Sequence, residues 1–463
     1  MTADYATLST RIQGLTKHPQ GSLRELWAIS FPLMLSLMSS SLMFFWDRLL
    51  LAQFSIEAHN AATSAGCMVA VLQFAFICTT CIAEVFVGQY NGAGEKNKIG
   101  KPVWQMIWLS VFSLIFFVPM GMYSADILFM GSRYQELEVG YFKYLMFFGP
   151  IFCVNGALSA FYIGRGCVTF VTCSVILANI LNTIFAYVLI FGMEPFISPL
   201  GIEGAALATG IAQTLQAAVL FIGFVLSDNR KTYGTGDYAF NWVEFKRCLQ
   251  IGLPSSVAHT IEIFAWALFF RMLTNVSDEH ITVVSIAQSI FYLFTFITEG
   301  ISKGATAIAA NMIGARQYDY VWKLLRSGVK FYFVMFILLG GILALNPSPL
   351  IQLFIANDMA NGNVHGLVAS ACFWVWIFFL LDGIHWLVVG LLTAAGDTKF
   401  VLKTGGSVVW LFALLPTYVL IVVFEQRADV AWAITALYGL ATCAIYLWRF
   451  HSEKWKRSVN CLT

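Results

Sequence analysis

In the stretch HTIEIFAWALFF, residues 259–270, one glutamate, Glu262, follows His259 and Thr260 and lies in a run otherwise made of Ile, Phe, Ala, Trp and Leu. The run belongs to a longer apolar window, residues 245–273, which exceeds the roughly 20 residues that an α-helix needs to cross a bilayer. A charge at that depth costs roughly 2.5–3.5 kcal/mol on insertion scales. The stretch therefore predicts a membrane-spanning helix whose carboxylate faces protein or water rather than lipid.

Similar apolar windows recur along almost the whole chain. Hydrophobic residues make up 59% of the sequence and charged residues only 11%, whereas a soluble domain carries roughly 25% charged residues. We expect an all-α membrane protein with twelve transmembrane helices in two pseudo-symmetric six-helix bundles. The expected spans are residues 25–51, 61–90, 102–128, 138–163, 169–192, 203–226, 245–273, 282–312, 321–345, 365–392, 400–424 and 430–450.

The positions of the basic residues predict the orientation. Most of the 27 Lys and Arg residues fall in the N-terminal segment, the alternate loops and the C-terminal tail, which places these parts in the cytoplasm. The N-terminus lacks the charged and apolar regions of a signal peptide. The net charge of +2 is dispersed and predicts no nucleic-acid partner. We expect a multi-pass protein of a bacterial inner membrane, in contact with lipid.

The two halves of the sequence resemble each other. ISFPLML (29–35) matches IGLPSSV (251–257), which places Pro32 and Pro254 222 positions apart, and VGQYNGAG (87–94) matches AANMIGAR (309–316) at the same spacing. Because each half has six helices, both enter from the same side, and the cavity is expected between two parallel repeats. The expected segments are 1–24, the N-terminal bundle 25–226, the linker 227–244, the C-terminal bundle 245–450 and the tail 451–463.

Two acidic residues of the C-terminal half are the first candidates for a functional site. Glu262 and Asp382 each have a histidine three positions away, in HTIE (His259) and DGIH (His385). This spacing puts the two groups on one face of a helix. Buried carboxylates beside imidazoles can exchange protons near neutral pH. The alternative for each histidine is a core imidazole bonded to a carbonyl or to its own acid.

The N-terminal half offers a second set of polar residues. Asp47 is expected to face a cavity, and Arg48 is a poor partner for it because adjacent residues do not face each other on a helix. Asn179 and Asn182 either complete a polar site with Asp47 or bond across helices.

Two prolines interrupt the backbone bonding of the first helix of each half. Pro32 and Pro254 each remove one backbone hydrogen bond, so bending there could gate a cavity, although a static kink is equally consistent.

Taken in order along twelve helices, several stretches make the chain resemble the multidrug and toxic compound extrusion (MATE) family, most closely its NorM-like branch. These stretches are GQYNGAGE, NILNTIFAYVLIFG, GIEGAALATGIAQ, GLPSSVAHTIE and LDGIHWLVVGLLTAAGDTKF. The resemblance implies cation coupling through Glu262, eight positions after Pro254, and through Asp382, fifteen positions before Asp397. It also implies that Asp47 is the family's aspartate of the first helix.

The chain departs from the family pattern at three places. Ala186 stands where another branch has a coupling aspartate, His385 stands where a glutamine is usual, and Thr393 stands where an arginine is often found. The additional histidines favour protons over sodium as the coupling ion, although Na⁺ at Glu262 and Asp382 remains the alternative.

We therefore expect a secondary antiporter that exports amphipathic organic cations in exchange for H⁺ or Na⁺, acting as a monomer without a cofactor. A lipid-linked saccharide flippase of the same superfamily is one alternative, but it would need a cationic cavity for a pyrophosphate. A polytopic membrane enzyme is another. The sequence contains no H-E-x-x-H or Walker motif, which argues against an enzyme.

Overall fold

A computed structural model describes residues 14–193, 195–352 and 363–459. Within these ranges the chain is almost entirely helical, and the β-structure there is one isolated bridge between Met193 and Ile197. Eleven of the described helices are long and apolar enough to cross a membrane. A further pair, Asp278–Tyr292 and Thr295–Gly314, bends by 47° and makes a twelfth span when counted together. The predicted all-α membrane fold is confirmed.

The chain divides into two compact units. The C-terminal unit comprises the described residues of Met1–Ser30, Val257–Ile313 and Gln317–Thr463, and the N-terminal unit comprises Phe31–Ser256 and Gly314–Arg316. Helix α2 (Leu23–Phe54) and helix α12 (Trp242–Val276) each begin in one unit and continue in the other. Each changes unit within three residues of its internal proline, Pro32 or Pro254.

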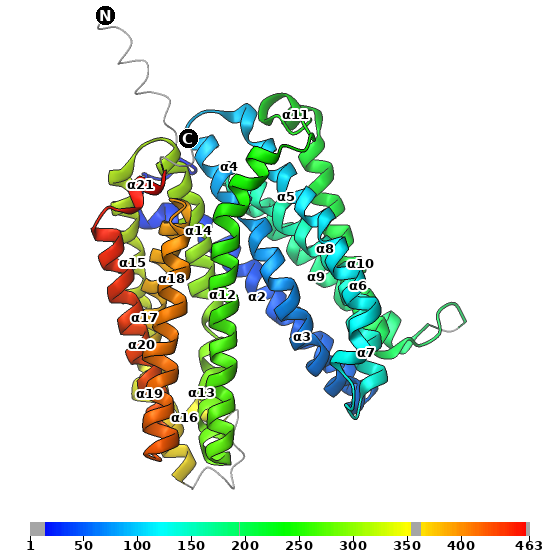
Figure 1. Ribbon diagram of the computed structural model, residues 1–463, viewed down its shortest axis with the longest axis vertical. Coiled ribbons are helices and arrows are strands. Elements are labelled where there is room, and N and C mark those ends of the chain that lie inside the picture. The colour runs from blue at the N-terminus through cyan, green and yellow to red at the C-terminus, as the bar shows by residue number, and fades with distance from the viewer. Residues whose placement is uncertain (1–13, 194, 353–362, 460–463) are drawn as a thin grey trace, which may run out of the picture. The chain divides into compact units, whose positions relative to one another are not determined.

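The N-terminal unit is built around α8, which packs against α3, α5 and α10, while α10 packs against α9 (Figure 1). A serine, Ser55, separates α2 from α3 because its hydroxyl accepts hydrogen bonds from the backbone N–H groups of Glu57 and Ala58. The elements after α2 are α3 (Ile56–Cys81), α4 (Ala83–Gly92), η1 (Lys96–Lys98), α5 (Gly100–Phe112), α6 (Leu114–Pro119), η2 (Met120–Ser124), α7 (Ala125–Leu128), α8 (Gln135–Ile163), α9 (Val168–Phe191), α10 (Gly201–Val225) and α11 (Ser227–Tyr233).

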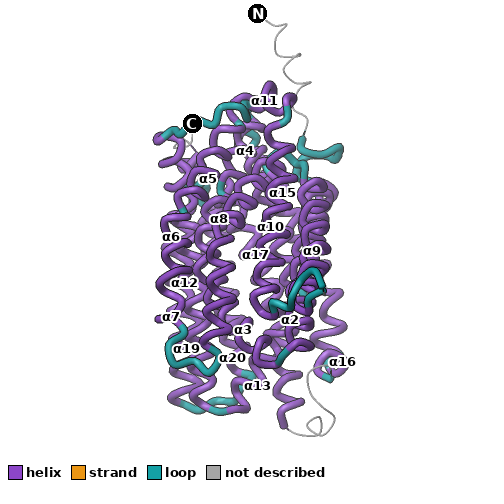
Figure 2. Tube along the Cα trace, turned by 90° about the vertical axis from the view of Figure 1, so that its right-hand side faces the viewer, coloured by secondary structure: helices purple, strands orange, loops and turns teal. Residues whose placement is uncertain are grey.

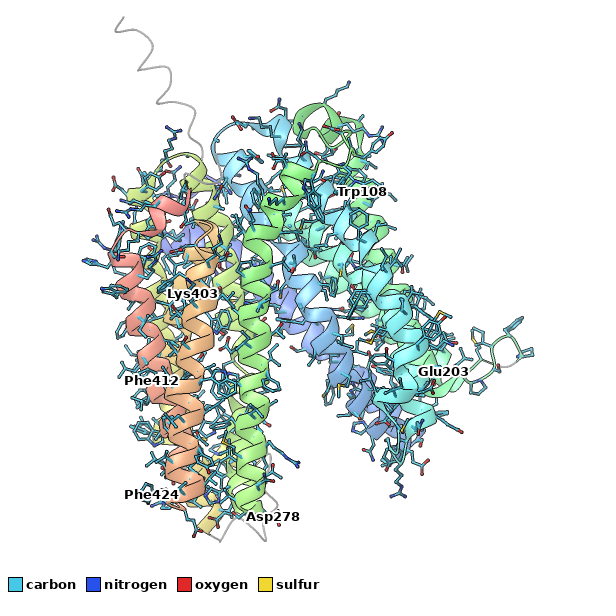
Figure 3. All side chains as sticks on the ribbon, in the orientation of Figure 1. Trp108, Glu203, Asp278, Lys403, Phe412 and Phe424 are labelled. Carbon is cyan, nitrogen blue, oxygen red and sulfur yellow. The ribbon has the colours of Figure 1, made fainter. Side chains whose placement is uncertain are left out.

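The linker between the predicted halves is fastened to α5. The indole N–H groups of Trp104 and Trp108 donate to the carbonyl oxygens of Thr235 and Tyr238, at 2.8 and 2.9 Å. Trp108 projects from α5 toward this segment in Figure 3. The segment after α11 is therefore held by side chains of the N-terminal unit.

The C-terminal unit is built around α17, which packs against α13, α15 and α20. At one end Arg449 of α20 forms a two-pronged ion pair with Asp397, at 2.7 and 3.1 Å. The tube in Figure 2 shows long helices joined by short loops. After α12 the elements are α13 (Asp278–Tyr292), α14 (Thr295–Gly314), α15 (Tyr318–Gly340), η3 (Gly341–Leu345), α16 (Ser348–Ile351), α17 (Asn363–Ala394), α18 (Thr398–Val409), η4 (Trp410–Leu414), α19 (Leu415–Thr417), η5 (Tyr418–Val423), α20 (Val430–His451) and α21 (Trp455–Val459).

Candidate functional site

Glu262 lies on α12 and has a partner on another helix of the same unit. The hydroxyl of Tyr438, on α20, donates a hydrogen bond to Glu262 Oε1 at 3.0 Å. Tyr438 is only 2% exposed, and Trp266, one turn after Glu262, packs edge-on against its ring at 5.6 Å. A phenol enclosed in this way needs a polar partner, and the carboxylate supplies it.

Asp382 and His385, both on α17, are buried and adjacent. His385 Nδ1 lies 4.0 Å from Asp382 Oδ1, and the imidazole packs edge-on against the ring of Tyr446 at 4.9 Å. The predicted pairing across three helix positions is therefore present in the structure. Because α12 and α17 contact each other through the rings of His259 and Trp386, we refer to Glu262, Asp382 and His385 together as the carboxylate cluster.

His259 of α12 has a ring contact with a residue of α17. Its imidazole lies flat against the indole of Trp386 on α17, with ring centroids 4.9 Å apart and an angle of 6° between the planes. Trp386 also contacts the ring of His385, at 5.3 Å. An indole thus connects the two histidines, and His259 belongs to the surroundings of the cluster through this ring.

In the N-terminal unit, Asp47 and its neighbour Arg48 are half-buried on α2. Asp47 Oδ1 and Arg48 Nη1 are both buried and have no hydrogen-bond partner. The Arg48 guanidinium lies 5.9 Å from the centre of the Tyr141 ring, and a Cβ at position 66 would come within 2.7 Å of it, so Gly66 provides its space. Arg48 thus packs toward α3 and α8, which leaves an oxygen of Asp47 available.

Asn179 and Asn182, on α9, bond across helices. Asn179 donates to Ser39 Oγ of α2 at 2.9 Å, and Asn182 donates to Thr209 Oγ1 of α10 at 3.0 Å. Ser39 lies eight positions before Asp47, about 12 Å along the helix. The structure thus shows the interhelical bonds, and Asn182 Oδ1 remains without a donor. That either asparagine shares a site with Asp47 stays a prediction.

The two prolines predicted as gates lie inside uninterrupted helices. The carbonyl of Pro32 accepts a hydrogen bond from Thr172 Oγ1 of α9, at 2.8 Å. Two positions after Pro254, the hydroxyl of Ser256 lies 2.7 Å from that of Thr79 on α3. Each proline therefore has a side-chain hydrogen bond at or near it, and the gating role stays a prediction.

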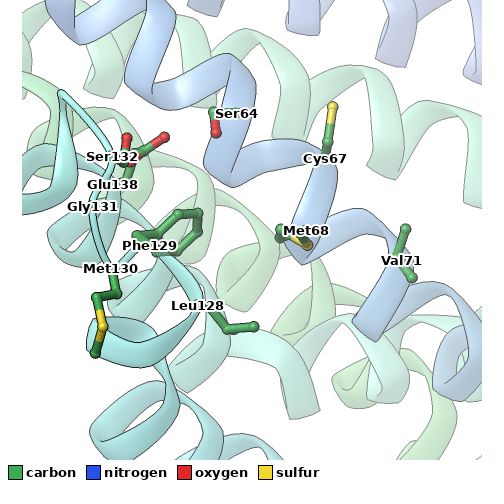
Figure 4. A pocket seen from close by; sticks show the side chains of 10 residues that line it. All are labelled: Ser64, Cys67, Met68, Val71, Leu128, Phe129, Met130, Gly131, Ser132 and Glu138. Carbon is green, nitrogen blue, oxygen red and sulfur yellow. The ribbon is translucent and has the colours of Figure 1, made fainter. Parts of the chain in front are cut away.

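A pocket of about 500 Å³ lies elsewhere in the N-terminal unit, between α3 and the segment that joins α7 to α8. Figure 4 shows Ser132 and Glu138 together on the α8 side and Ser64, Cys67 and Met68 on α3. Glu138 is 2% exposed, and its Oε2 has no hydrogen-bond partner. None of the predicted site residues lines this pocket.

Sequence reasoning missed several of these side chains. Tyr438 and Trp386 lie in strongly apolar helices, where aromatic residues are too common to single out. The feature that could have identified them is the polar atom of each ring, because a buried tyrosine hydroxyl in a membrane-spanning helix needs a hydrogen-bond partner. Glu138 resembles an ordinary acidic residue in the first turn of a helix, and the sequence around it gives no sign that its side chain is buried.

The MatE family model matches this chain twice, at residues 32–188 and 254–419, which together span more than half of its length. The chain belongs to the MATE family. The two MATE matches begin at Pro32 and Pro254, which confirms the predicted repeat at its predicted offset.

Known MATE proteins resemble the chain along almost its whole length. A probable multidrug resistance protein NorM of Thermotoga maritima is 21% identical over 440 residues, covering 94% of this chain and 93% of the relative. A protein of the same description from Xylella fastidiosa is 22% identical over 442 residues, covering 92% and 91%. A crystal structure of MATE in complex with MaL6 gives a TM-score of 0.82 at 18% identity, covering 95% of this chain and 98% of that chain. The solved structure confirms the fold, and membership of the MATE family makes this chain a multi-pass membrane transporter rather than an enzyme.

Proposed function

We propose that this MATE transporter is a secondary antiporter that exports amphipathic organic cations in exchange for H⁺ or Na⁺, by alternating access. The observation that carries the proposal is the carboxylate cluster, in which Glu262 is bonded to a phenol and Asp382 lies beside an imidazole, on two apolar helices that contact each other. Intramembrane acids are costly and mark ion or substrate pathways. The NorM relatives, described as probable multidrug resistance proteins, support the same cargo class.

Competition for the acids provides the coupling. An ion that enters from outside neutralises Glu262 and Asp382, which weakens their attraction for a cationic cargo and favours its release. One elementary charge moving inward contributes about 2.3 kcal/mol per 100 mV, and about 1.4 kcal/mol corresponds to a tenfold ratio of concentrations. The outward movement of a monovalent cationic cargo costs the same amount, so a one-for-one exchange is driven by the concentration gradient of the ion, and the membrane potential contributes only where more than one ion enters per cargo.

The side chains around the acids favour the proton as the coupling ion. Glu262 is bonded to a phenol and Asp382 lies beside an imidazole, and each of these groups can exchange a proton with a carboxylate. Sodium is a hard cation that prefers a cage of several oxygen atoms, to which an imidazole nitrogen contributes little.

The N-terminal unit supplies the second part of the proposal. Asp47 Oδ1 and Asn182 Oδ1 are acceptors without partners, so they are suited to meet the charge or the N–H groups of an organic cation. Bending at Pro32 and Pro254, close to where α2 and α12 pass between units, would let the units move during the transport cycle. We place the protein as a monomer in a bacterial inner membrane with both termini in the cytoplasm, following the distribution of Lys and Arg.

A lipid-linked saccharide flippase is the second candidate function, and the position of the Arg48 side chain is the observation that favours it. Its guanidinium is enclosed and Nη1 lacks an acceptor, as a site for a pyrophosphate would require. The neighbouring Asp47 and the acids of the carboxylate cluster oppose such a ligand.

Purified protein in liposomes tests the proposal. Export of ethidium is measured under a proton gradient without sodium, and under a sodium gradient without a pH difference. We expect proton-driven export that Glu262→Gln and Asp382→Asn each reduce at least tenfold. Sodium-driven export of equal rate would overturn the preference for protons, and unchanged export in both variants would overturn the assignment of the acids. Translocation of a lipid-linked pyrophosphate without ethidium export would favour the flippase.

A further inference from the structure

The pocket between α3 and the segment joining α7 to α8 has no part in the proposed antiport. We propose that it is a second binding site, for a monovalent organic cation with an apolar body, in which Glu138 holds the positive charge. The proposal rests on the pocket, on the enclosure of Glu138 and on the side chains around them. It does not depend on the roles proposed for Glu262, Asp382 or Asp47.

The size and lining of the pocket define the class of ligand. A volume of about 500 Å³ falls within the range of pockets that hold drug-sized molecules. Met68, Leu128 and Met130 present large apolar groups that are 44%, 41% and 74% exposed. Flexible thioethers adapt to ligands of varied shape. Such a lining suits the apolar body of a ligand better than it suits a small inorganic ion.

Glu138 supplies the single charge of the site. Its side chain is 98% enclosed, it lines the pocket, and Oε2 has no hydrogen-bond partner. A carboxylate removed from water needs a counter-charge or a donor. A cation in the pocket would provide one, with the hydroxyls of Ser64 and Ser132 beside it (Figure 4).

The ordinary explanation of Glu138 is that its charge stabilises the N-terminus of α8. Acids in a first turn stabilise the N-terminus of a helix, and α8 carries two of them, Glu136 and Glu138. Glu136 is exposed to solvent, so it can play that part without enclosure. The enclosed position and the unbonded oxygen distinguish Glu138, and Glu136 becomes its matched control.

Local sequence fixes the wall of the pocket on the α8 side. Gly131 has a φ of +79°, a left-handed conformation that favours glycine and turns the chain. The hydroxyl of Ser132 accepts a hydrogen bond from the Tyr134 N–H. The ring of Phe129 is anchored edge-on against Phe142, at 5.5 Å. The wall is therefore formed by packed and bonded residues, as a preformed site requires.

Binding of radiolabelled tetraphenylphosphonium to purified protein in detergent tests the charge. The measurement starts from the Asp47→Asn/Glu262→Gln/Asp382→Asn triple variant, in which all the acids proposed to meet cargo in the antiport are already removed. We expect that variant to bind the cation, that adding Glu138→Gln weakens binding at least tenfold, and that adding Glu136→Gln changes it less than twofold. Equal effects of the two glutamine variants, or none from Glu138→Gln, would overturn the site. Loss of ion-driven export in the triple variant concerns the antiport proposal alone.

Protection of a native cysteine tests the location without any change at Glu138. Cys67 is exposed and lines the pocket, whereas Cys167 is exposed on the loop before α9. The rates of maleimide labelling at both residues are followed by peptide mass spectrometry in the wild-type protein. Saturating tetraphenylphosphonium should slow labelling of Cys67 at least fivefold and leave Cys167 unchanged. An unchanged rate at Cys67, or equal slowing at both residues, would contradict the proposal.

Discussion

The two repeats share a backbone plan but carry their polar groups at different positions. At the repeat offset given by Pro32 and Pro254, Glu262 corresponds to Ser40 and Asp47 corresponds to Phe269. Ser40 lies 3.4 Å from the amide of Asn179, whereas Phe269 is buried in apolar packing. Duplication thus explains the helices, and the chemistry of each half comes from side chains that changed afterwards.

The side chains that contact the acidic residues also differ between the two units. In the C-terminal unit, Glu262 receives a hydrogen bond from Tyr438 and Asp382 lies beside His385. In the N-terminal unit, Asp47 Oδ1 has no partner. A partnered acid is suited to exchange a proton, and an unpartnered acceptor is suited to receive cargo. We therefore expect ion and cargo to compete for the acids of the C-terminal unit, and Asp47 of the N-terminal unit to be a further contact for cargo that takes no part in ion coupling.

The largest effect is expected from neutralising an acid of the carboxylate cluster. Glu262→Gln should reduce proton-driven export in liposomes by tenfold to a hundredfold, because the side chain can no longer alternate between charged and neutral forms. Exchange of labelled for unlabelled cation across the membrane, without a gradient, should persist. If Glu262→Gln abolished this exchange as well, Asp382 and Asp47 would be unable to hold cargo without Glu262, and the separate cargo contact in the N-terminal unit would be contradicted.

The reverse pattern is expected at Asp47. Asp47→Asn should raise the KM for a cationic cargo about tenfold and leave the dependence of the rate on the proton gradient intact, because it removes a charge that meets cargo. Kinetics of ethidium export at several cargo concentrations would show the effect. Glu57→Gln, an exposed acid near the start of α3, is the control. Loss of proton dependence in Asp47→Asn would place coupling in both units.

A smaller effect is expected at the partner of Glu262. Tyr438→Phe removes one hydrogen bond to a carboxylate, an interaction that contributes roughly 1.5–3 kcal/mol when one group is charged. The pH at which export is half-maximal should shift, while the maximal rate changes only a few-fold. Tyr418→Phe, at a tyrosine that is 52% exposed, should shift nothing. An unchanged pH profile in Tyr438→Phe would mean that the phenol has only a packing role.

The smallest effect is expected at the asparagines, as a change of stability. Asn182→Ala removes the bond to Thr209, and interhelical hydrogen bonds of this kind contribute roughly 0.6 kcal/mol on average. A double-mutant cycle with Thr209→Val, read from thermal unfolding in detergent, would give the coupling between them. A large change of KM in Asn182→Ala without loss of stability would instead place Asn182 in the cargo site.

The fold could be predicted from sequence because its signals are local and repeated. Apolar windows of spanning length and two anchors at one offset define the helices and the duplication. The spacing of Asp382 and His385 predicted a contact within one helix. The flat contact of His259 with Trp386 was not predicted, because it depends on how α12 and α17 pack. Tyr438 and Glu138 were missed for the same reason, since their partners or enclosure arise from residues distant in sequence.

Release of protons on cargo binding tests the central claim most directly. Purified protein in weakly buffered detergent solution is mixed with tetraphenylphosphonium, and the pH is followed with an indicator dye. The account predicts that binding releases protons from the wild-type protein and that the Glu262→Gln/Asp382→Asn double variant releases markedly fewer. Binding without proton release, or equal release from both proteins, would contradict it.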